Sequence, residues 1–175
     1  MRPFSIPKAY ENMTRSECKK FKQLGIWEHI LESEWTAPSF FVPKKTGDGR
    51  IVMDFHELNK YIVRKLYPLP KIQDLLQKLE KFKYTMAIDL RRGYYHIPLD
   101  EISSKLCMTV FPWGKYSYKK LPMGLSNAPD IFQHAMNIVF ADMEFVMVYL
   151  DNVLILSNEQ DTFANHLNKC HLVLE

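Results

Sequence analysis

The feature that most limits the possible folds is a pair of short apolar runs near residue 150. FVMVYL at 145–150 and VLIL at 153–156 are separated only by Asp151 and Asn152. Two apolar runs joined by two turn-forming residues predict a tight β-hairpin. Asp and Asn favour such turns because they tolerate left-handed backbone conformations. We therefore predict an antiparallel strand pair that carries Asp151 at its tip.

Four other segments have helical patterns. TRSE at 14–17 matches a capping box, and Gly25 is expected to end the helix that follows. Apolar residues recur at helical spacing over 68–82. Ser126 or Asn127 is expected to cap a helix that continues to Met143. The last helix is predicted to carry on one face Phe163, Leu167, Cys170 and Leu174.

Three further segments are predicted to be extended. Residues 40–55 form a hairpin whose tip, KKTGDGR, is basic, and 106–121 form a second one. Residues 84–88 form a strand that runs directly into Asp89. This order of elements predicts the α+β class, with an antiparallel sheet covered by helices on one side.

Size and composition fit a single globular domain. The chain has 175 residues, of which 47% are hydrophobic and 25% charged, so it can build its own core. It contains no apolar run of the ~20 residues that span a membrane and no secretory signal. Its three cysteines include no CxxC pair. We therefore expect reduced thiols in the cytoplasm or the nucleus, and no membrane partner.

The charge is unevenly distributed along the chain. Residues 1–83 contain 16 Lys and Arg against 10 Asp and Glu, whereas residues 84–175 contain 7 against 10. A basic first half is typical of a protein that binds a polyanion, and an acidic second half suits cation binding. A basic surface that is merely solvated explains the same charges.

Asp89 and Asp151 are the residues most suited to chemistry. Each follows an apolar strand, so its carboxylate would be wet on one side and rigidly held on the other. Two such carboxylates suit Mg²⁺, a hard cation that binds substrate phosphates. Two ions about 4 Å apart would then stabilise an in-line phosphoryl transfer. An ordinary tight turn with no catalytic role explains the Asp-Asn pair equally well.

Other candidate sites have similar alternatives. One interpretation of the basic residues Lys44, Lys45 and Arg50 is that they contact phosphates. The alternative is an exposed loop that only contributes to solubility. Gly124, in LPMGLSNAP at 121–129, would let the backbone approach a ligand before a helix, or belong to an ordinary loop. His166, Cys170 and His171 have a weak zinc-like pattern, but helix core and surface positions explain them better.

Five segments, taken in order, resemble the reverse transcriptase domain of gypsy-type LTR retrotransposons over roughly residues 20–175. They are KKTGDGRIVMDFHELNK (44–60), YPLPKIQDLLQKL (67–79), MAIDLRRGYYHIPL (86–99), LPMGLSNAPDIFQ (121–133) and FVMVYLDNVLILS (145–157). They are similar to the fingers hairpin with its D-[YF]-R-x-L-N motif, the Y-P-L-P helix, the first catalytic motif, the P-x-G-L-x-N-A-P loop and the Y-x-D-D hairpin.

The resemblance implies a right-hand polymerase with fingers (mostly 1–83) and palm (mostly 84–175) in a single domain fragment, without a thumb. It implies template-directed DNA synthesis with two Mg²⁺ ions, or with Mn²⁺. The implied catalytic positions are Asp89, Asp151 and Asn152, and the implied metal ligands are Asp89, Asp151 and the Leu90 carbonyl. The implied nucleotide-binding positions are Lys44, Lys45, Arg50, Tyr94, Met123 and Gly124. Tyr94 would pack under the sugar and exclude a 2′-hydroxyl.

Two positions depart from the family pattern. Asn152 stands where the family has a second Asp, which lowers the number of carboxylates in the site from three to two. His56 stands where an arginine is usual. Two hypotheses follow: an RNA-directed DNA polymerase weakened by Asn152, and a non-catalytic module, derived from a reverse transcriptase, that binds nucleic acid or protein.

The resemblance also implies partners. They are an RNA or DNA template with its primer, deoxynucleoside triphosphates, and the other domains of a polyprotein, namely thumb, RNase H and integrase. The expected location is the cytoplasm, with a virus-like particle or the nucleus as alternatives.

Overall fold

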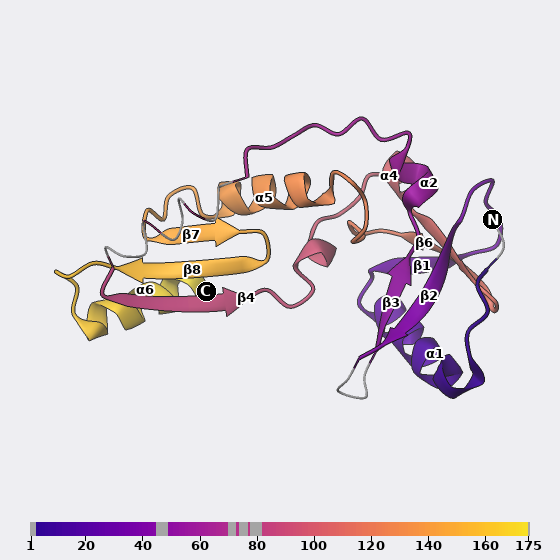
Figure 1. Cartoon of the computed structure of the whole chain (residues 1–175), viewed down its shortest axis with the longest axis horizontal. Coiled ribbons are helices and arrows are strands. Elements are labelled where there is room, and N and C mark those ends of the chain that lie inside the picture. Colours follow the sequence, from indigo (N-terminus) through magenta and orange to yellow (C-terminus); the bar gives the residue numbers. More distant parts are fainter. Residues whose placement is uncertain (1–2, 45–48, 70–72, 74–76, 78–81, 175) are drawn as a thin grey trace. The chain divides into compact units, whose positions relative to one another are not determined.

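The computed structural model describes residues 3–44, 49–69, 73, 77 and 82–174 (Figure 1). The chain forms two compact units, each built from two stretches of sequence. Unit 1 comprises residues 1–64 and 94–128, and unit 2 comprises 65–93 and 129–175. The chain therefore returns to unit 1 after the first part of unit 2, which a single division near residue 83 does not capture. Most of the helix predicted over 68–82 lies outside the described residues.

Unit 1 contains a five-stranded sheet with the strand order β1-β6-β5-β2-β3. Its strands are β1 (Trp27–Ile30), β2 (Ala37–Pro43), β3 (Gly49–Met53), β5 (Met108–Phe111) and β6 (Gly114–Tyr118). The pairs β2–β3 and β5–β6 are the two predicted hairpins, and both are antiparallel. One neighbouring pair, β2–β5, is parallel, so this sheet is mixed rather than purely antiparallel.

Helices complete unit 1: α1 (Lys8–Gln23), α2 (His56–Asn59), α4 (Glu101–Leu106) and the 3-10 helix η1 (Gly93–His96), which begins at the unit boundary. The core is aromatic. Trp27 is 1% exposed and contacts the rings of Phe21, Phe111, Tyr116 and Tyr118. Its indole Nε1 donates a hydrogen bond to the Cys18 carbonyl at 3.2 Å, so the polar end of the buried ring is satisfied. Cys18, Cys107 and Cys170 are all free, as predicted.

Helix α1 begins earlier than the sequence predicted and ends where it predicted. The TRSE segment is not a cap, because Thr14 lies inside the helix and its hydroxyl donates to the Tyr10 carbonyl at 2.8 Å. Such a bond to the preceding turn is an alternative use of the same side chain. At the other end, Gly25 has φ +64°. The Ile26 and Gly25 amides donate to the Phe21 and Lys22 carbonyls, which is the Schellman arrangement.

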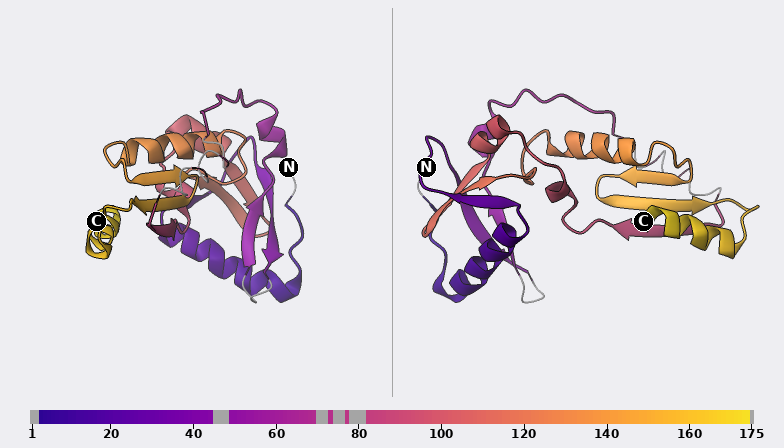
Figure 2. Two further views of the ribbon diagram at one scale, coloured as in Figure 1. Left: turned by 60° about the vertical axis from the view of Figure 1, so that its left-hand side comes forward. Right: turned by 180° about the vertical axis from the view of Figure 1, so that it is seen from behind.

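Unit 2 contains a three-stranded antiparallel sheet with the order β4-β8-β7. The strands are β4 (Tyr84–Asp89), β7 (Val146–Tyr149) and β8 (Asn152–Ser157), and the helices are α5 (Ala128–Val139) and α6 (Phe163–Leu174). Helix α6 contacts β4 and β8, whereas α5 runs beside β7 (Figures 1 and 2). The buried side chains of β8 (Val153, Ile155 and Leu156) form the centre of this unit. No helix among the described residues is long and apolar enough to cross a membrane.

The predicted cap of α5 is wrong. The Ser126 hydroxyl and the Asn127 side-chain oxygen make no hydrogen bond within the described part of the chain. The Ser126 amide instead donates to the side-chain oxygen of Asn59 at 2.9 Å. The Ser126 amide precedes the first helical residue, so this bond holds the approach to α5 and does not cap it. The helix ends at Val139 rather than at Met143.

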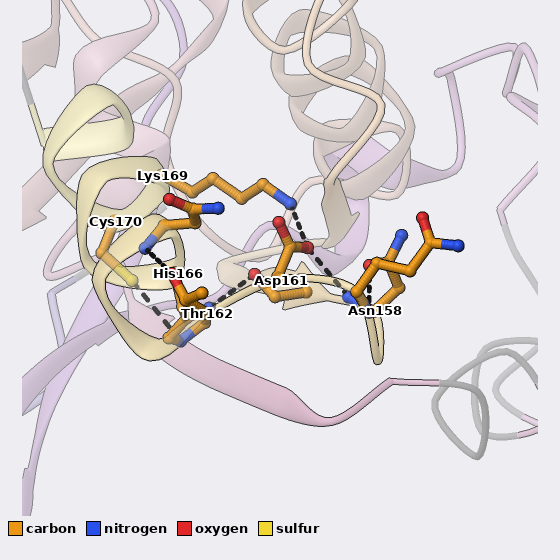
Figure 3. A network of polar contacts seen from close by, with 9 residues as sticks. Asn158, Asp161, Thr162, His166, Lys169 and Cys170 are labelled. Carbon is orange, nitrogen blue, oxygen red and sulfur yellow. Dashed lines mark hydrogen bonds and ion pairs between the residues drawn. The ribbon is translucent and has the colours of Figure 1, made fainter.

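The predicted buried face of α6 is also wrong in part. Cys170 is buried, but Phe163 and Leu167 are 58% and 51% exposed. The helix turns His166 inward instead, and its Nδ1 lies 2.9 Å from the Ser157 hydroxyl. Figure 3 shows how the preceding loop is fixed: the Asp161 carboxylate accepts from Lys169 at 2.7 Å and from the Asn158 amide at 3.0 Å. The Lys169 hydrogen bond is the main reason why the pKa of Asp161 lies below its ordinary value.

Candidate active site

The strand register of unit 2 brings the predicted catalytic residues together. Asp89, the last residue of β4, pairs directly with Asn152, the first residue of β8. Directly opposed residues in an antiparallel pair have side chains on the same face, with Cβ atoms about 5 Å apart. The Leu90 amide donates to the Asp151 carbonyl at 2.8 Å, which ties the residue after Asp89 to the turn that carries Asp151.

The turn itself is placed one residue earlier than predicted. Tyr149 pairs with Asn152, so the two turn residues are Leu150 and Asp151 rather than Asp151 and Asn152. Leu150 has φ +52°, a left-handed conformation that is costly for a side chain larger than glycine. The sequence pointed to Asp-Asn because these residues tolerate that conformation best. The actual turn leaves Asn152 in the ladder, between Asp89 and Tyr149.

The two carboxylates are accessible. Asp89 is exposed and Asp151 is half-buried. No described residue forms a hydrogen bond or ion pair with the Asp89 carboxylate. The Asn152 side-chain amide lies 3.5 Å from an Asp151 oxygen, at the long limit of a hydrogen bond. Among the described residues, no ion pair neutralises the charge of either carboxylate.

The donor atoms at this site fit a hard divalent cation. The side chains of Asp89, Asp151 and Asn152 offer oxygen atoms, which are the ligands that Mg²⁺ prefers. The Leu90 carbonyl accepts from the Gly93 amide at 3.2 Å and keeps a second lone pair for another partner. Over the described ranges, no group of three or more His, Cys, Asp and Glu side chains is placed to share a metal.

The loop after Asp89 needs glycine at its end. A Cβ atom on Gly93 would lie 2.8 Å from Cζ of Phe132 in α5 and 3.4 Å from Cβ of Leu90. The first distance is too short for any real contact. Gly93 therefore lets α5 approach the loop that carries Leu90, close to the predicted metal ligands.

Sequence reasoning missed Gln133. Its side chain is fully buried, and its amide bonds to the backbone on both sides of Tyr149, at Val148 and Leu150. The sequence feature that could have identified it is a glutamine within a mainly apolar helical segment, at the end of the motif LPMGLSNAPDIFQ. A buried amide requires partners, but the sequence alone does not show that these belong to the Asp151 turn.

The predicted nucleotide-binding residues belong to unit 1. Lys44, directly after β2, and Arg50, the second residue of β3, are exposed, whereas Lys45 lies outside the described residues. Tyr94, in η1, is half-buried and packs against the aromatic core. Its structural surroundings therefore give it at least a packing role.

The loop that carries Met123 and Gly124 is held by α2. Met123 is 43% exposed, and Gly124 has φ +99°. Asn59 donates to the Gly124 carbonyl at 2.9 Å and accepts from the Ser126 amide at 2.9 Å. This two-point clamp, which the sequence did not reveal, fixes the backbone on both sides of Leu125. His56, at the other end of α2, is exposed, and its backbone amide donates to the Asp54 carboxylate at 3.0 Å.

A comparison with known protein families matches residues 42–175 to the family described as "Reverse transcriptase (RNA-dependent DNA polymerase)". The chain belongs to the reverse transcriptase family. The matched range includes every candidate site residue named above, from Lys44 to Asn152.

Curated relatives of this reverse transcriptase domain include polyproteins of retrotransposons. It is 34% identical to the Pol polyprotein of transposon 297 and 33% identical to that of transposon gypsy, both from Drosophila melanogaster, over 81% and 90% of the chain. It is 34% identical to the Tf2-7 polyprotein of Schizosaccharomyces pombe over 95% of the chain. The chain spans only 14%, 16% and 13% of these three proteins.

Solved structures confirm the fold of the reverse transcriptase domain. A foamy virus protease–reverse transcriptase matches 99% of the chain with a TM-score of 0.87 at 22% identity, and the chain covers 23% of that protein. A foamy viral protease–reverse transcriptase in complex with an RNA/DNA hybrid matches with a TM-score of 0.87 at 21% identity. The predicted α+β, fingers–palm architecture is therefore confirmed.

Proposed function

We propose that this reverse transcriptase domain binds a primer–template and a deoxynucleoside triphosphate for RNA-directed DNA synthesis, and that Asn152 lowers its activity. The observation that carries the proposal is the register of Asp89 opposite Asn152, with Leu90 hydrogen-bonded to Asp151. The end of β4 and the β7–β8 turn carry Asp89 and Asp151, and within the described residues neither carboxylate is in an ion pair.

Asp89 and Asp151 would hold two Mg²⁺ ions, or Mn²⁺, with the Leu90 carbonyl as a backbone ligand. When bound, the ions would supply charge stabilisation for the attacking and leaving oxygens of phosphoryl transfer. Asn152 is close to isosteric with Asp, so it keeps the ladder intact while it removes one negative charge from the site. Its side-chain oxygen remains a neutral donor to a metal or a hydroxyl group.

The residues of unit 1 would bind the substrate. Lys44, Lys45 and Arg50 are assigned to the triphosphate, in keeping with the exposure of Lys44 and Arg50. Met123 and Gly124 are assigned to the incoming nucleotide, with the backbone held by Asn59. Tyr94 is assigned to the sugar, where it would exclude a 2′-hydroxyl. The thumb, RNase H and integrase would be supplied by the remainder of a polyprotein, with the cytoplasm as the site of action.

Primer extension tests the proposal. A poly(rA)/oligo(dT) substrate is incubated with deoxythymidine triphosphate and Mg²⁺ or Mn²⁺, using the 175-residue chain and a longer polypeptide that includes a thumb. We expect weak extension that Asp89→Asn abolishes. Extension that is unaffected by Asp89→Asn would overturn the assignment.

The absence of a third carboxylate favours a second function. Asn152 stands beside Asp89 and Asp151 and leaves the site with two carboxylates instead of three. If two carboxylates are too few for catalysis, the domain would bind nucleic acid or a protein partner without catalysing a reaction. Salt-dependent primer–template binding without extension, even with a thumb and Asn152→Asp, is the result that this alternative predicts.

A further inference from the structure

Gln133 is a buried polar residue of α5. Its side chain forms hydrogen bonds with the backbone of the β7–β8 turn that carries Asp151, and with Asn137 in the same helix. Its Oε1 accepts from the Leu150 amide at 2.8 Å, and its Nε2 donates to the Val148 carbonyl at 3.1 Å. The backbone partners are a fixed donor and a fixed acceptor, so they determine which end of the side-chain amide is which. Gln133 thus fixes the backbone immediately before Asp151.

The backbone at this point needs such support. Leu150 has φ +52°, and a non-glycine residue in this region costs about 1–2 kcal/mol. Strained residues of this kind persist only where the surrounding structure enforces them. The hydrogen bond from Leu150 to Gln133 enforces the conformation that presents Asp151 beside Asp89 and Asn152.

Gln133 is itself held by a chain of hydrogen bonds. Its Nε2 also donates to Oδ1 of Asn137, one turn later in α5, at 2.9 Å. Asn137 in turn donates to the Tyr67 hydroxyl at 2.9 Å. Tyr67 is anchored by its amide, which donates to the Asp130 carboxylate at 3.0 Å, and by its ring, 5.0 Å from that of His134. All these residues belong to unit 2.

We propose that Gln133 is a positioning residue for Asp151, and that Asn137 and Tyr67 hold its amide in the orientation this role requires. None of the three touches the predicted metal ions. They act by holding the turn, and the proposal rests on the proposed function, in which Asp151 binds the metal. Residues that orient metal ligands in this way typically contribute tenfold to a hundredfold to metal affinity.

Two variants of the 175-residue chain test the proposal. Gln133→Met keeps the approximate volume and removes the hydrogen bonds, and Tyr67→Phe removes only the terminal hydroxyl. Met136→Ala is the matched control, because it lowers stability from a buried apolar position of the same helix. Asp151→Asn tests the metal assignment itself.

Two measurements by NMR distinguish positioning from simple stabilisation. The first is Mn²⁺ affinity, from the paramagnetic broadening of the Asn152 amide signal during titration with Mn²⁺ alone. The second is hydrogen exchange at the Leu150 amide, relative to the Lys83 amide, which bonds to Ser157 at the far end of the same sheet. Thermal unfolding of each variant provides the comparison of stability.

We expect Gln133→Met to weaken Mn²⁺ binding by about tenfold or more and to speed Leu150 exchange by a similar factor. Tyr67→Phe should produce smaller changes of roughly twofold to fivefold in the same direction. Met136→Ala should leave both quantities within about twofold of the unmodified chain.

Different results overturn different assignments. If Asp151→Asn weakens Mn²⁺ binding and Gln133→Met does so no more than Met136→Ala, the positioning role is wrong and the metal site stands. If Asp151→Asn leaves Mn²⁺ binding unchanged, the proposed metal site is wrong, and the positioning role falls with it. Unchanged Leu150 exchange in Gln133→Met shows that the turn does not depend on this side chain.

Discussion

Replacing Asn152 with Asp should have opposite effects with and without metal. The new carboxylate would face Asp89 directly across the β4–β8 ladder and adjoin Asp151 in the turn. Without a cation, the three negative charges repel each other and the hairpin loses stability. With a divalent cation, the same charges attract it, so metal binding and activity should increase.

The register allows the size of both effects to be worked out. At about 5 Å and with a water-like dielectric, two unit charges interact with about 0.8 kcal/mol, and a divalent cation at that distance gains about 1.7 kcal/mol. Screening at physiological ionic strength reduces these energies by roughly half. Metal affinity should therefore rise by about fourfold to seventeenfold, where tenfold corresponds to about 1.4 kcal/mol. Because the new carboxylate repels both Asp89 and Asp151, the metal-free protein should lose about 0.8–1.7 kcal/mol of stability.

The assay combines thermal unfolding with primer extension. Asn152→Asp should lower the midpoint of unfolding in a chelating buffer and raise it in saturating Mg²⁺, relative to the unmodified chain. In a longer polypeptide that includes the thumb, extension should increase about tenfold, and Asp151→Asn or Asp89→Asn on that background should abolish it. Asn165→Asp, an exposed position in α6, is the control for the change in net charge.

Two outcomes would refute this reasoning. One is a shift of the unfolding midpoint in the same direction with and without Mg²⁺, because a carboxylate added beside a cation site should destabilise the metal-free protein and stabilise the metal-bound protein. The other is full activity of the unmodified protein with no gain from Asn152→Asp, which would show that the third carboxylate does not limit the reaction. If both proteins are inactive with the thumb present, His56 is the next residue to restore.

Three further predictions concern other parts of the fold. Replacing Lys44 and Arg50 with Ala should weaken primer–template binding and flatten its dependence on salt, because binding with fewer phosphate contacts releases fewer counterions. Fluorescence anisotropy at several salt concentrations measures this dependence. An unchanged slope would show that both residues are ordinary solvated side chains. Tyr94→Ala should allow ribonucleotides to be incorporated during primer extension, whereas unchanged discrimination would limit Tyr94 to its packing role. Gly93→Ala should destabilise the protein by about 1–3 kcal/mol, because its Cβ would lie 2.8 Å from Phe132; a chemical denaturation curve that matches the unmodified chain would show that α5 shifts freely.

The elements that local patterns determine were predicted well. The apolar runs before and after residue 151 gave the β7–β8 hairpin, and the run ending at Asp89 gave β4. Gly25 marked the end of α1 because few other residues adopt a left-handed backbone at low cost. These features depend on neighbours in sequence, which is why the sequence alone was sufficient.

The features that depend on distant partners were missed. Leu150, rather than Asn152, occupies the turn because Gln133 holds its amide from another element. The predicted cap of α5 did not form: the Ser126 hydroxyl and the Asn127 side-chain oxygen make no hydrogen bond within the described residues, and the Ser126 amide bonds to the Asn59 side chain, 67 positions away in sequence. His166 rather than Leu167 faces inward because Ser157 offers a hydrogen-bond partner. In each case a specific tertiary hydrogen bond outweighs a local preference.

The interleaving of the two units along the chain has a consequence for synthesis on the ribosome. Within the described residues β1 pairs with β6 alone, and β4 finds its partner β8 about sixty residues later. At about 5–20 residues per second, each strand must wait several seconds for its partner to emerge. The nascent chain therefore carries unpaired strand edges from both units at the same time, and neither unit can close until translation has passed well beyond residue 115. A pause in translation between residues 94 and 114, after β4 and before β6 have been made, would prolong this state, and chaperone binding is expected to be strongest there.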